Sequence, residues 1–239
     1  VSADRLIDAL WGQQPPPTAA KILQNAVSQL RRALGEDRLV TQPPGYRFRL
    51  DQDELDLHRF EELAQEGRTK GDARVLRDAL AIWRGAPLAN LHDESFAQHA
   101  ARQLEEARLS VLEDRIDADL AAGRDAVLVP ELEQLIAAEP LRERPYGQLM
   151  LALYGDGRQA DALATYQRAR KMLSQEVGLE PSPQLQELER RMLNQDPALA
   201  PGRASMAIRS SQRHRRRFLL AGAALVGVAA LALGLVLTG

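Results

Sequence analysis

Cysteine is absent from the 239 residues of this chain, and aromatic side chains are scarce. Without cysteine the chain forms neither disulfides nor thiolate metal sites, which agrees with a reducing compartment. Aromatic residues make up 4% of the sequence and charged residues 27%, a balance typical of a helical protein with an aliphatic core. An excess of one charge is also missing, since the formal net charge is −2, so the chain as a whole carries no nucleic-acid-binding signal.

Motifs of the common catalytic sites are missing as well. The sequence contains no GxxxxGK[ST], GxGxxG, GxSxG or HExxH pattern, so none of the sites that these motifs build is predicted. The four histidines are scattered, and no two of them stand four residues apart. Carboxylates between residues 105 and 119 alternate with arginines, which is typical of an exposed helix with ion pairs along its own surface. We therefore expect no enzymatic activity, no metal and no cofactor.

The most informative block runs from Thr18 to Leu50 and reads TAAKILQNAVSQLRRALGEDRLVTQPPGYRFRL. Its apolar residues recur at spacings of four, three and four, which predicts a helix with one apolar face that ends at Gly35. These residues are Leu23, Val27, Leu30 and Leu34. Apolar and basic residues then alternate up to Leu50 around the turn Pro43-Pro44-Gly45, which predicts a β-hairpin.

The other face of this helix carries polar side chains of the kinds that contact DNA. Amide and hydroxyl groups read base edges, and cationic groups bind phosphates. A lone solvated helix has a similar composition, but here a short helix over Ser2–Trp11 and a Pro-rich connector precede it. Helix, turn, helix and hairpin in this order predict a winged helix-turn-helix domain. The residues predicted to contact DNA are Lys21, Gln24, Asn25, Ser28, Gln29, Arg31, Arg32, Arg47 and Arg49.

Several blocks resemble a known family. SADRLIDALWG, AVSQLRRALG and PPGYRFRL resemble the end of the OmpR-like winged-helix domain of SARP-type bacterial transcriptional activators, the antibiotic-regulatory-protein family. ELDLHRFEELAQEG, IWRGAPLANL and the sequence from 147 to 193 resemble the bacterial transcriptional activator domain of the same family, which is built like tetratricopeptide repeats (TPR). The resemblance covers about residues 1–193. It implies a winged-helix domain over 1–51 without its N-terminal sheet and first helix, and Gln29 stands where the family often has arginine.

The middle of the chain is predicted to be helical almost throughout, with helices separated by Gly and Pro. The expected helices cover 55–67, 73–84, 95–122, a segment ending at 138, 145–154, 159–175 and 182–193. Ala162, Tyr166 and Ala169 have the four-then-three spacing of the second helix of a TPR unit. The predicted fold class is therefore mainly α, with a TPR-like domain over 52–195 that follows the winged helix.

The end of the chain predicts a membrane segment. Residues 218–237 form an uncharged apolar run that would span roughly 30 Å as a helix, the thickness of a bilayer core. A basic cluster stands directly before it and is expected to face lipid headgroups on the cytoplasmic side. Its arginines are Arg213, Arg215, Arg216 and Arg217. Residues 196–217 are predicted as a flexible basic linker, and the protein as a single-pass protein of the cytoplasmic (inner) membrane.

These patterns favour a membrane-tethered transcriptional regulator that binds specific DNA sequences. Binding to direct repeats as a homodimer is expected, with the helical domain contacting the second copy or RNA polymerase. The alternative is a membrane-anchored, TPR-like scaffold that binds proteins and not DNA, since a winged helix that begins at Val1 lacks part of its core. Retardation of operator DNA by the chain would decide between the two.

Overall fold

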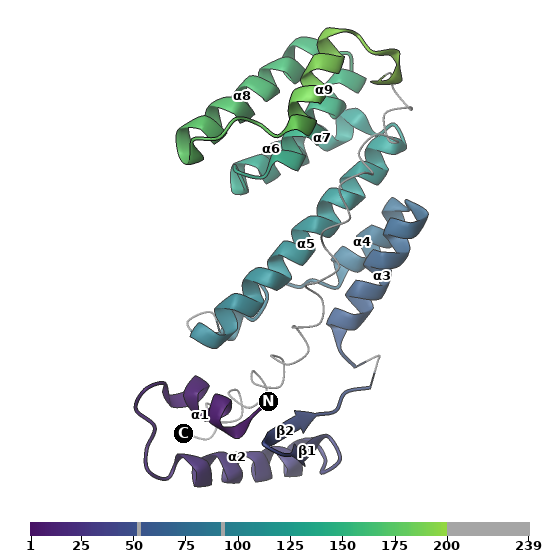
Figure 1. Cartoon of the computed structure of the whole chain (residues 1–239). Helices are drawn as coiled ribbons and strands as arrows, with labels where there is room; N and C mark the ends of the chain where they lie inside the picture. Colours follow the sequence, from purple (N-terminus) through teal and green to yellow (C-terminus); the bar gives the residue numbers. More distant parts are fainter. Residues whose placement is uncertain (52–53, 92–93, 200–239) are drawn as a thin grey trace. The chain divides into compact units, whose positions relative to one another are not determined.

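The structure of the chain is a computed structural model that describes residues 1–51, 54–91 and 94–199 (Figure 1). Two compact units share these residues. The first unit contains residues 1–60 and 82–108, and the second contains residues 61–81 and the described residues from 109 onwards. Helices account for most of both units, and the predicted mainly helical fold with one short antiparallel hairpin is confirmed.

Two helices begin the first unit, α1 (Ala3–Trp11) and α2 (Ala19–Leu34). Ser2 caps α1, because its Oγ accepts a hydrogen bond of 3.2 Å from the backbone N–H of Arg5. Gly35 ends α2 with a φ of +100°, and its N–H donates back to the carbonyl of Arg31. The long polar connector between the helices thus separates two well-defined helical segments.

A hairpin of β1 (Leu39–Gln42) and β2 (Gly45–Phe48) follows α2. The strands pair antiparallel, with Leu39 opposite Phe48 and Gln42 opposite Gly45, so the turn falls at Pro43-Pro44 as predicted. The first residues of the chain run along the other edge of β2, where Ser2 forms a bridge with Gly45. A side chain at residue 45 would put a Cβ 2.0 Å from the carbonyl oxygen of Val1, so only glycine fits there.

The core of this part is small and aliphatic. Leu6 of α1, Leu23 and Val27 of α2 and Leu39 of β1 form its buried centre, and each is at most 3% exposed. Partly buried residues such as Leu30, Tyr46 and Phe48 surround this centre. Leu34, the last residue of the predicted apolar face, is 45% exposed. The apolar stripe of α2 therefore extends one turn beyond the core that it helps to form.

The remaining elements are helical. These are α3 (Asp56–Lys70), α4 (Ala73–Ala81), the 3₁₀ turn η1 (Ala89–Leu91), α5 (Ser95–Ala121), α6 (Asp125–Ala138), α7 (Glu143–Gly155), α8 (Gln159–Val177), α9 (Pro183–Leu193) and the 3₁₀ turn η2 (Pro197–Leu199). They match the predicted helices to within a few residues. Regular structure continues to Leu199, which is 3% exposed and packs into the core of the second unit, whereas the sequence places a linker from residue 196. The domain boundaries at 51 and 195 stay predictions.

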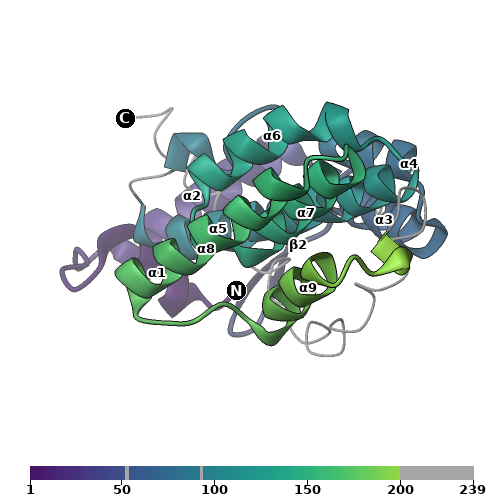
Figure 2. The ribbon, with the colours of Figure 1, turned by 90° about the horizontal axis from the view of Figure 1, so that it is seen from above.

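Helix α7 is the centre of the second unit. It packs against α6 on one side and α8 on the other, and α9 lies against both α7 and α8 (Figure 2). Its residues 148–153 are all buried. On α8 the small residues Ala162 and Ala169 are fully buried, and Tyr166 between them is 6% exposed. Because small side chains let helix backbones approach closely, this face of α8 accounts for the tight packing on α7.

The acidic residues of α5 depart from their predicted role. Two of the predicted pairs along the helix form, Arg108 with Glu105 and Arg115 with Asp119. However, Glu113 is 2% exposed and Asp119 is 1% exposed, so the prediction of an exposed helix is wrong at these two positions. Their partners come mainly from other segments. Asp119 accepts hydrogen bonds from Arg77 of α4, Arg115 of α5 and Arg124 in the turn before α6. Such a network joins helices to one another instead of solubilising one of them.

A second group of ion pairs joins α5 to α7 within the same unit. Arg144 donates to both Asp114 and Asp117, and Gln148 donates to Asp117 at 2.6 Å. Burial lowers the pKa of the Arg144 guanidinium, but the facing carboxylates of Asp117 and Asp114 raise it by more, so its net pKa is above the ordinary value. Arg144 therefore stays charged, and the pairing holds at any pH at which the carboxylates are ionised.

Among the helices of the described residues, none is long and apolar enough to cross a membrane. Only α5 and α8 reach eighteen residues, and both carry many charged side chains. The predicted membrane helix at 218–237, the basic cluster Arg213, Arg215, Arg216 and Arg217, and most of the predicted linker lie outside the described residues.

Candidate nucleic-acid interface

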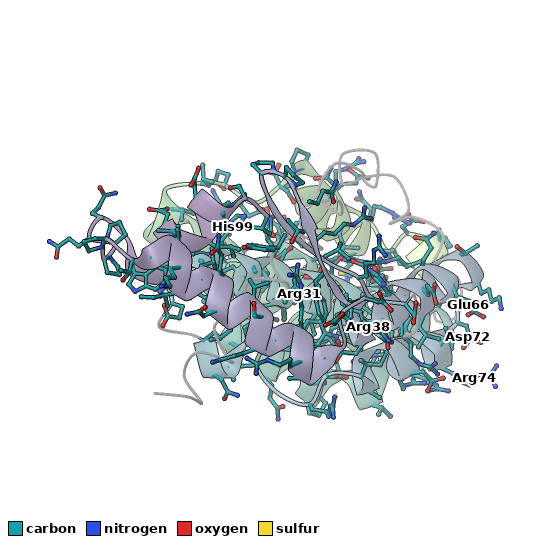
Figure 3. The ribbon with its side chains drawn as sticks, turned by 90° about the horizontal axis from the view of Figure 1, so that it is seen from below. Arg31, Arg38, Glu66, Asp72, Arg74 and His99 are labelled. Atoms are coloured by element: carbon teal, nitrogen blue, oxygen red, sulfur yellow. The ribbon has the colours of Figure 1, made fainter. Side chains whose placement is uncertain are left out.

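Helix α2 presents two chemically opposite faces. Leu23 and Val27 are each 1% exposed, and Ala26 is also buried. The predicted contact residues on the other face are exposed, namely Lys21, Gln24, Asn25, Ser28, Gln29 and Arg32. Figure 3 shows α2 with side chains extending from it into solvent. The fold therefore fixes one face of the helix against the core and leaves a polar stripe along the other.

Several groups in this polar stripe have no partner in the described part of the protein. The side chains of Lys21, Asn25 and Gln29 make no hydrogen bond or ion pair with another described residue. The Ser28 hydroxyl donates to the carbonyl of Gln24 at 2.9 Å, which leaves its oxygen free to accept. Donors and acceptors of the amides are thus available to an external ligand.

The two adjacent arginines of α2 have different surroundings. Arg32 is exposed, and its Nε lies 3.4 Å from the carbonyl oxygen of Ser28 in its own helix. Arg31 is half-buried and bound to β1, where its Nε donates to the carbonyl of Leu39 at 2.6 Å and its Nη2 donates to the Thr41 hydroxyl at 2.7 Å (Figure 3). The sequence predicts the same role for both arginines, whereas in the structure Arg32 is exposed to solvent and Arg31 is bound to the hairpin.

The hairpin adds cations on its exposed side. Arg47 and Arg49 on and just after β2 are exposed, and no carboxylate of the described residues lies within 4.0 Å of either. Pro43 and Pro44 of the turn are exposed too, and so is Gln42, the last residue of β1, which is not among the contact residues predicted from the sequence. Its position directly before the turn residues was the only available signal. Unpaired cations and one amide therefore line the hairpin.

Arg38 differs from these arginines because it is neutralised. Its guanidinium makes two hydrogen bonds to the carboxylate of Glu54, and Asp51 lies 3.6 Å away. The hydrogen bond from Arg38 holds the pKa of Glu54 below its usual value, and the backbone N–H of Asp51 lowers it further. This pair ties the start of the hairpin to the segment that enters α3, so Arg38 adds little positive charge to the surface.

No set of three or more histidine, aspartate and glutamate side chains is arranged to hold a metal ion in the regions that the structure describes. The site consists of amides, one hydroxyl and cationic groups on α2 and the hairpin. Such groups donate hydrogen bonds and attract anions, and nucleic acid offers both base edges and phosphates to them.

Comparison with known proteins identifies relatives along most of the chain. Residues 55–193 match the profile of a family described as "Bacterial transcriptional activator domain", and residues 182–239 match one described as a protein of unknown function. The regulatory protein DnrI of Streptomyces peucetius is 38% identical over 232 residues, which cover 87% of this chain and 85% of DnrI. The regulatory protein AfsR of Streptomyces coelicolor is 46% identical over 214 residues.

The match to AfsR covers 86% of this chain but only 22% of AfsR, so the chain corresponds to about a fifth of that relative. Among solved structures, Mycobacterium tuberculosis EmbR, in complex with a low affinity phosphopeptide, superimposes with a TM-score of 0.80 at 34% identity. That superposition covers 86% of this chain and 57% of the EmbR chain. The helices and the hairpin described above therefore form a fold that EmbR shares.

These relatives contradict the predicted location in the inner membrane. They are named regulatory and transcriptional regulatory proteins, and their similarity extends over more than four fifths of this chain. The prediction rested on the apolar run 218–237 and on the basic cluster directly before it. Length and apolarity make a segment able to span a bilayer, but they do not establish that it does so. The single-pass membrane assignment is therefore corrected.

Proposed function

The chain belongs to the SARP-type family of bacterial transcriptional regulators, and on this premise we propose that its first unit binds specific DNA sequences as a winged helix-turn-helix domain. In this proposal α2 is the recognition helix and the β1–β2 hairpin is the wing. The observation that carries the proposal is the polar stripe of α2, which faces solvent while the opposite face of the same helix is buried.

The dimensions and chemistry of the stripe suit the major groove. From Lys21 to Arg32 the helix rises roughly 16 Å, and a major groove about 12 Å wide admits a helix. Asn25 and the glutamines of the stripe supply amides, which pair with the edge of adenine, and Ser28 supplies a hydroxyl acceptor. Lys21 and Arg32 lie near the two ends of the stripe, where a groove-bound helix passes phosphates.

The wing supplies the second set of contacts in this proposal. Arg47 and Arg49 carry positive charge that no described carboxylate neutralises, so they are available to phosphates or to the minor groove. Gln42, the last residue of β1, is a further proposed contact, because its amide is exposed directly before the turn at the tip of the wing. Arg31 does not belong to this set, because its guanidinium already donates to Leu39 and Thr41 of β1.

The helical unit is proposed to serve assembly. The buried Ala162, Tyr166 and Ala169 of α8 support a TPR-like packing of α7 and α8, and helical repeats of this kind commonly bind protein partners. We infer that this unit contacts either a second copy of the chain on direct repeats or RNA polymerase. Both partners belong to the proposal, because the relatives' names specify only regulation.

Selection from a pool of random-sequence DNA duplexes tests this function. The full chain is incubated with the pool, bound duplexes are amplified over several rounds, and the enriched sequence is measured by fluorescence anisotropy against a scrambled duplex of equal length. We expect an enriched site bound at least about 10³-fold more tightly than the scrambled one. A pool that yields no enriched sequence, with equal affinity for both duplexes, would contradict the proposal.

A further inference from the structure

We propose that Arg31 holds the wing in register with the recognition helix and does not itself contact DNA. This inference rests on the proposed function and concerns one residue of the same site. Arg31 lies in the last turn of α2. Its guanidinium reaches two successive outward-facing groups of β1, the carbonyl of Leu39 and the hydroxyl of Thr41.

The geometry of the hairpin explains why an arginine is needed there. In an antiparallel pair, alternate residues direct their backbone N–H and C=O groups away from the partner strand. The carbonyl of Arg38 accepts from the N–H of Arg49 at 2.7 Å, so the next carbonyl, that of Leu39, points to the free edge of β1. Leu39 is 3% exposed, and a carbonyl in such surroundings without a partner is destabilising. The Nε of Arg31 supplies that partner.

The second contact fixes the orientation of the guanidinium. Its Nη2 donates to Thr41 while Nε donates to Leu39, so two donors on one edge of the planar group are used together. A lysine has no such fork and cannot make both contacts in this geometry. Because Nε and Nη2 bind two different residues of β1, together they fix both the distance and the angle between α2 and β1.

The neighbouring arginines show that positive charge alone does not place an arginine between the helix and the hairpin. Arg32, one residue further along, is exposed and has only a 3.4 Å contact to its own helix. Arg38 is bound by Glu54. Of the three arginines around the end of α2, only Arg31 joins the helix to the hairpin. A wing held in place before DNA arrives loses less freedom on binding, which favours affinity for all sequences.

The test uses the full chain and two pairs of variants. Thr41→Val removes the hydroxyl acceptor without changing any charge, and Thr41→Ser retains it. Arg31→Ala removes the bridging group, and Arg32→Ala removes the adjacent exposed cation. Hydrogen–deuterium exchange of residues 39–50 is measured without DNA, and anisotropy is measured on the selected and scrambled duplexes at several salt concentrations.

We expect Arg31→Ala to accelerate exchange in the hairpin by about tenfold, because charged hydrogen bonds to β1 are lost, while Arg32→Ala leaves exchange unchanged. Thr41→Val should weaken binding to both duplexes by roughly threefold with the salt slope unaltered, and Thr41→Ser should match the unaltered chain. Combining Thr41→Val with Arg31→Ala should add little, since both remove the same bridge. Folded fractions of all variants are checked by circular dichroism.

Unchanged hairpin exchange in Arg31→Ala, together with a salt slope reduced by about one, would overturn the inference and make Arg31 a phosphate contact. Faster exchange with undiminished DNA affinity would overturn it too, because the bridge would then matter only to folding. Failure of the proposed function is a different result, in which the unaltered chain prefers no duplex. The exchange measurement would still decide whether the bridge holds the hairpin.

Discussion

Val1 and Tyr46 exchange two backbone hydrogen bonds across forty-five residues of sequence. The N–H of Tyr46 donates to the carbonyl of Val1 at 2.9 Å, and the amino group of Val1 donates to the carbonyl of Tyr46 at 2.8 Å. The hairpin is thereby supported on both edges, by Val1 and Ser2 beside β2 and by Arg31 beside β1. Its position relative to α1 and α2 follows from contacts at both edges.

Replacing Gly45 by alanine should displace Val1 and Ser2 from the edge of β2. The added Cβ would lie 2.0 Å from the carbonyl oxygen of Val1 and 2.6 Å from the Cα of Ser2, and both are backbone atoms with little room to move. We expect the free energy of unfolding to fall by roughly 1–3 kcal/mol, as for overpacked sites in general. Urea unfolding followed by circular dichroism measures it. Gly85→Ala is the matched control, because a Cβ at residue 85 meets nothing within 4 Å.

Asn25→Ala and Arg47→Ala should affect DNA binding in different ways. Losing the Asn25 amide should remove about 1–3 kcal/mol of discrimination at one base pair and leave scrambled DNA bound as before. Losing Arg47 should weaken binding to both duplexes and lower the salt slope by about one. Anisotropy titrations over a range of salt concentrations measure both effects.

The control for this pair is Lys171→Ala, which removes an exposed cation of α8 in the second unit. It should leave both affinities unchanged. If Asn25→Ala and Arg47→Ala weakened binding to selected and scrambled DNA to the same degree, the assignment of base reading to α2 would be wrong.

Asp119→Ala should strongly destabilise the second unit. Asp119 is 1% exposed and accepts from three arginines, of which Arg115 is itself 6% exposed. Removing the carboxylate leaves a buried guanidinium short of a partner, which typically costs about 3–5 kcal/mol. Chemical unfolding gives the difference. Asp161→Ala removes an exposed partner of Arg158 and should cost about 1 kcal/mol or less. Equal effects of the two would show that the network adds nothing through burial.

The Arg38–Glu54 pair should give a pH-dependent signal. The hydrogen bond from Arg38 keeps the pKa of Glu54 below its ordinary value of 4.5. Because the pKa is lowered in the folded state, the stabilisation is complete above that ordinary value and is lost as the pH falls through the folded-state pKa. Carbon-13 NMR titration of the Glu54 carboxylate measures it. Arg38→Gln should return the midpoint towards the ordinary value, and an unchanged midpoint would contradict the assignment of the cause.

Much of the fold could be predicted because local signals mark the ends of its elements. Gly35 and the turn at Pro43-Pro44-Gly45 placed the end of α2 and the hairpin correctly. Likewise, the spacing of apolar residues on α2 predicted correctly that the face with Leu23 and Val27 is buried. These features depend on neighbours within a few residues, so the sequence pattern contains them.

Features that depend on distant partners could not be predicted. Nothing in the sequence distinguishes Arg31 from Arg32, because the acceptors that separate them belong to β1. The carboxylates of α5 have the sequence pattern of a solvated helix, yet Asp119 is buried against arginines up to 42 residues away. The same spacing of acidic and basic residues occurs on a solvent-exposed helix and on a helix buried against the arginines of its neighbours. Only the packing of the other helices decides which of the two forms.

The bridge from Arg31 has an evolutionary consequence, because one of its two acceptors is a main-chain carbonyl. The oxygen of residue 39 is present whatever side chain that residue carries, so this contact survives mutation of the strand. Residues 24, 25, 28 and 29 on the exposed face of α2 are not part of the bridge. Descendants of one ancestral regulator could therefore diverge in the DNA sequence they prefer while inheriting the same placement of the hairpin.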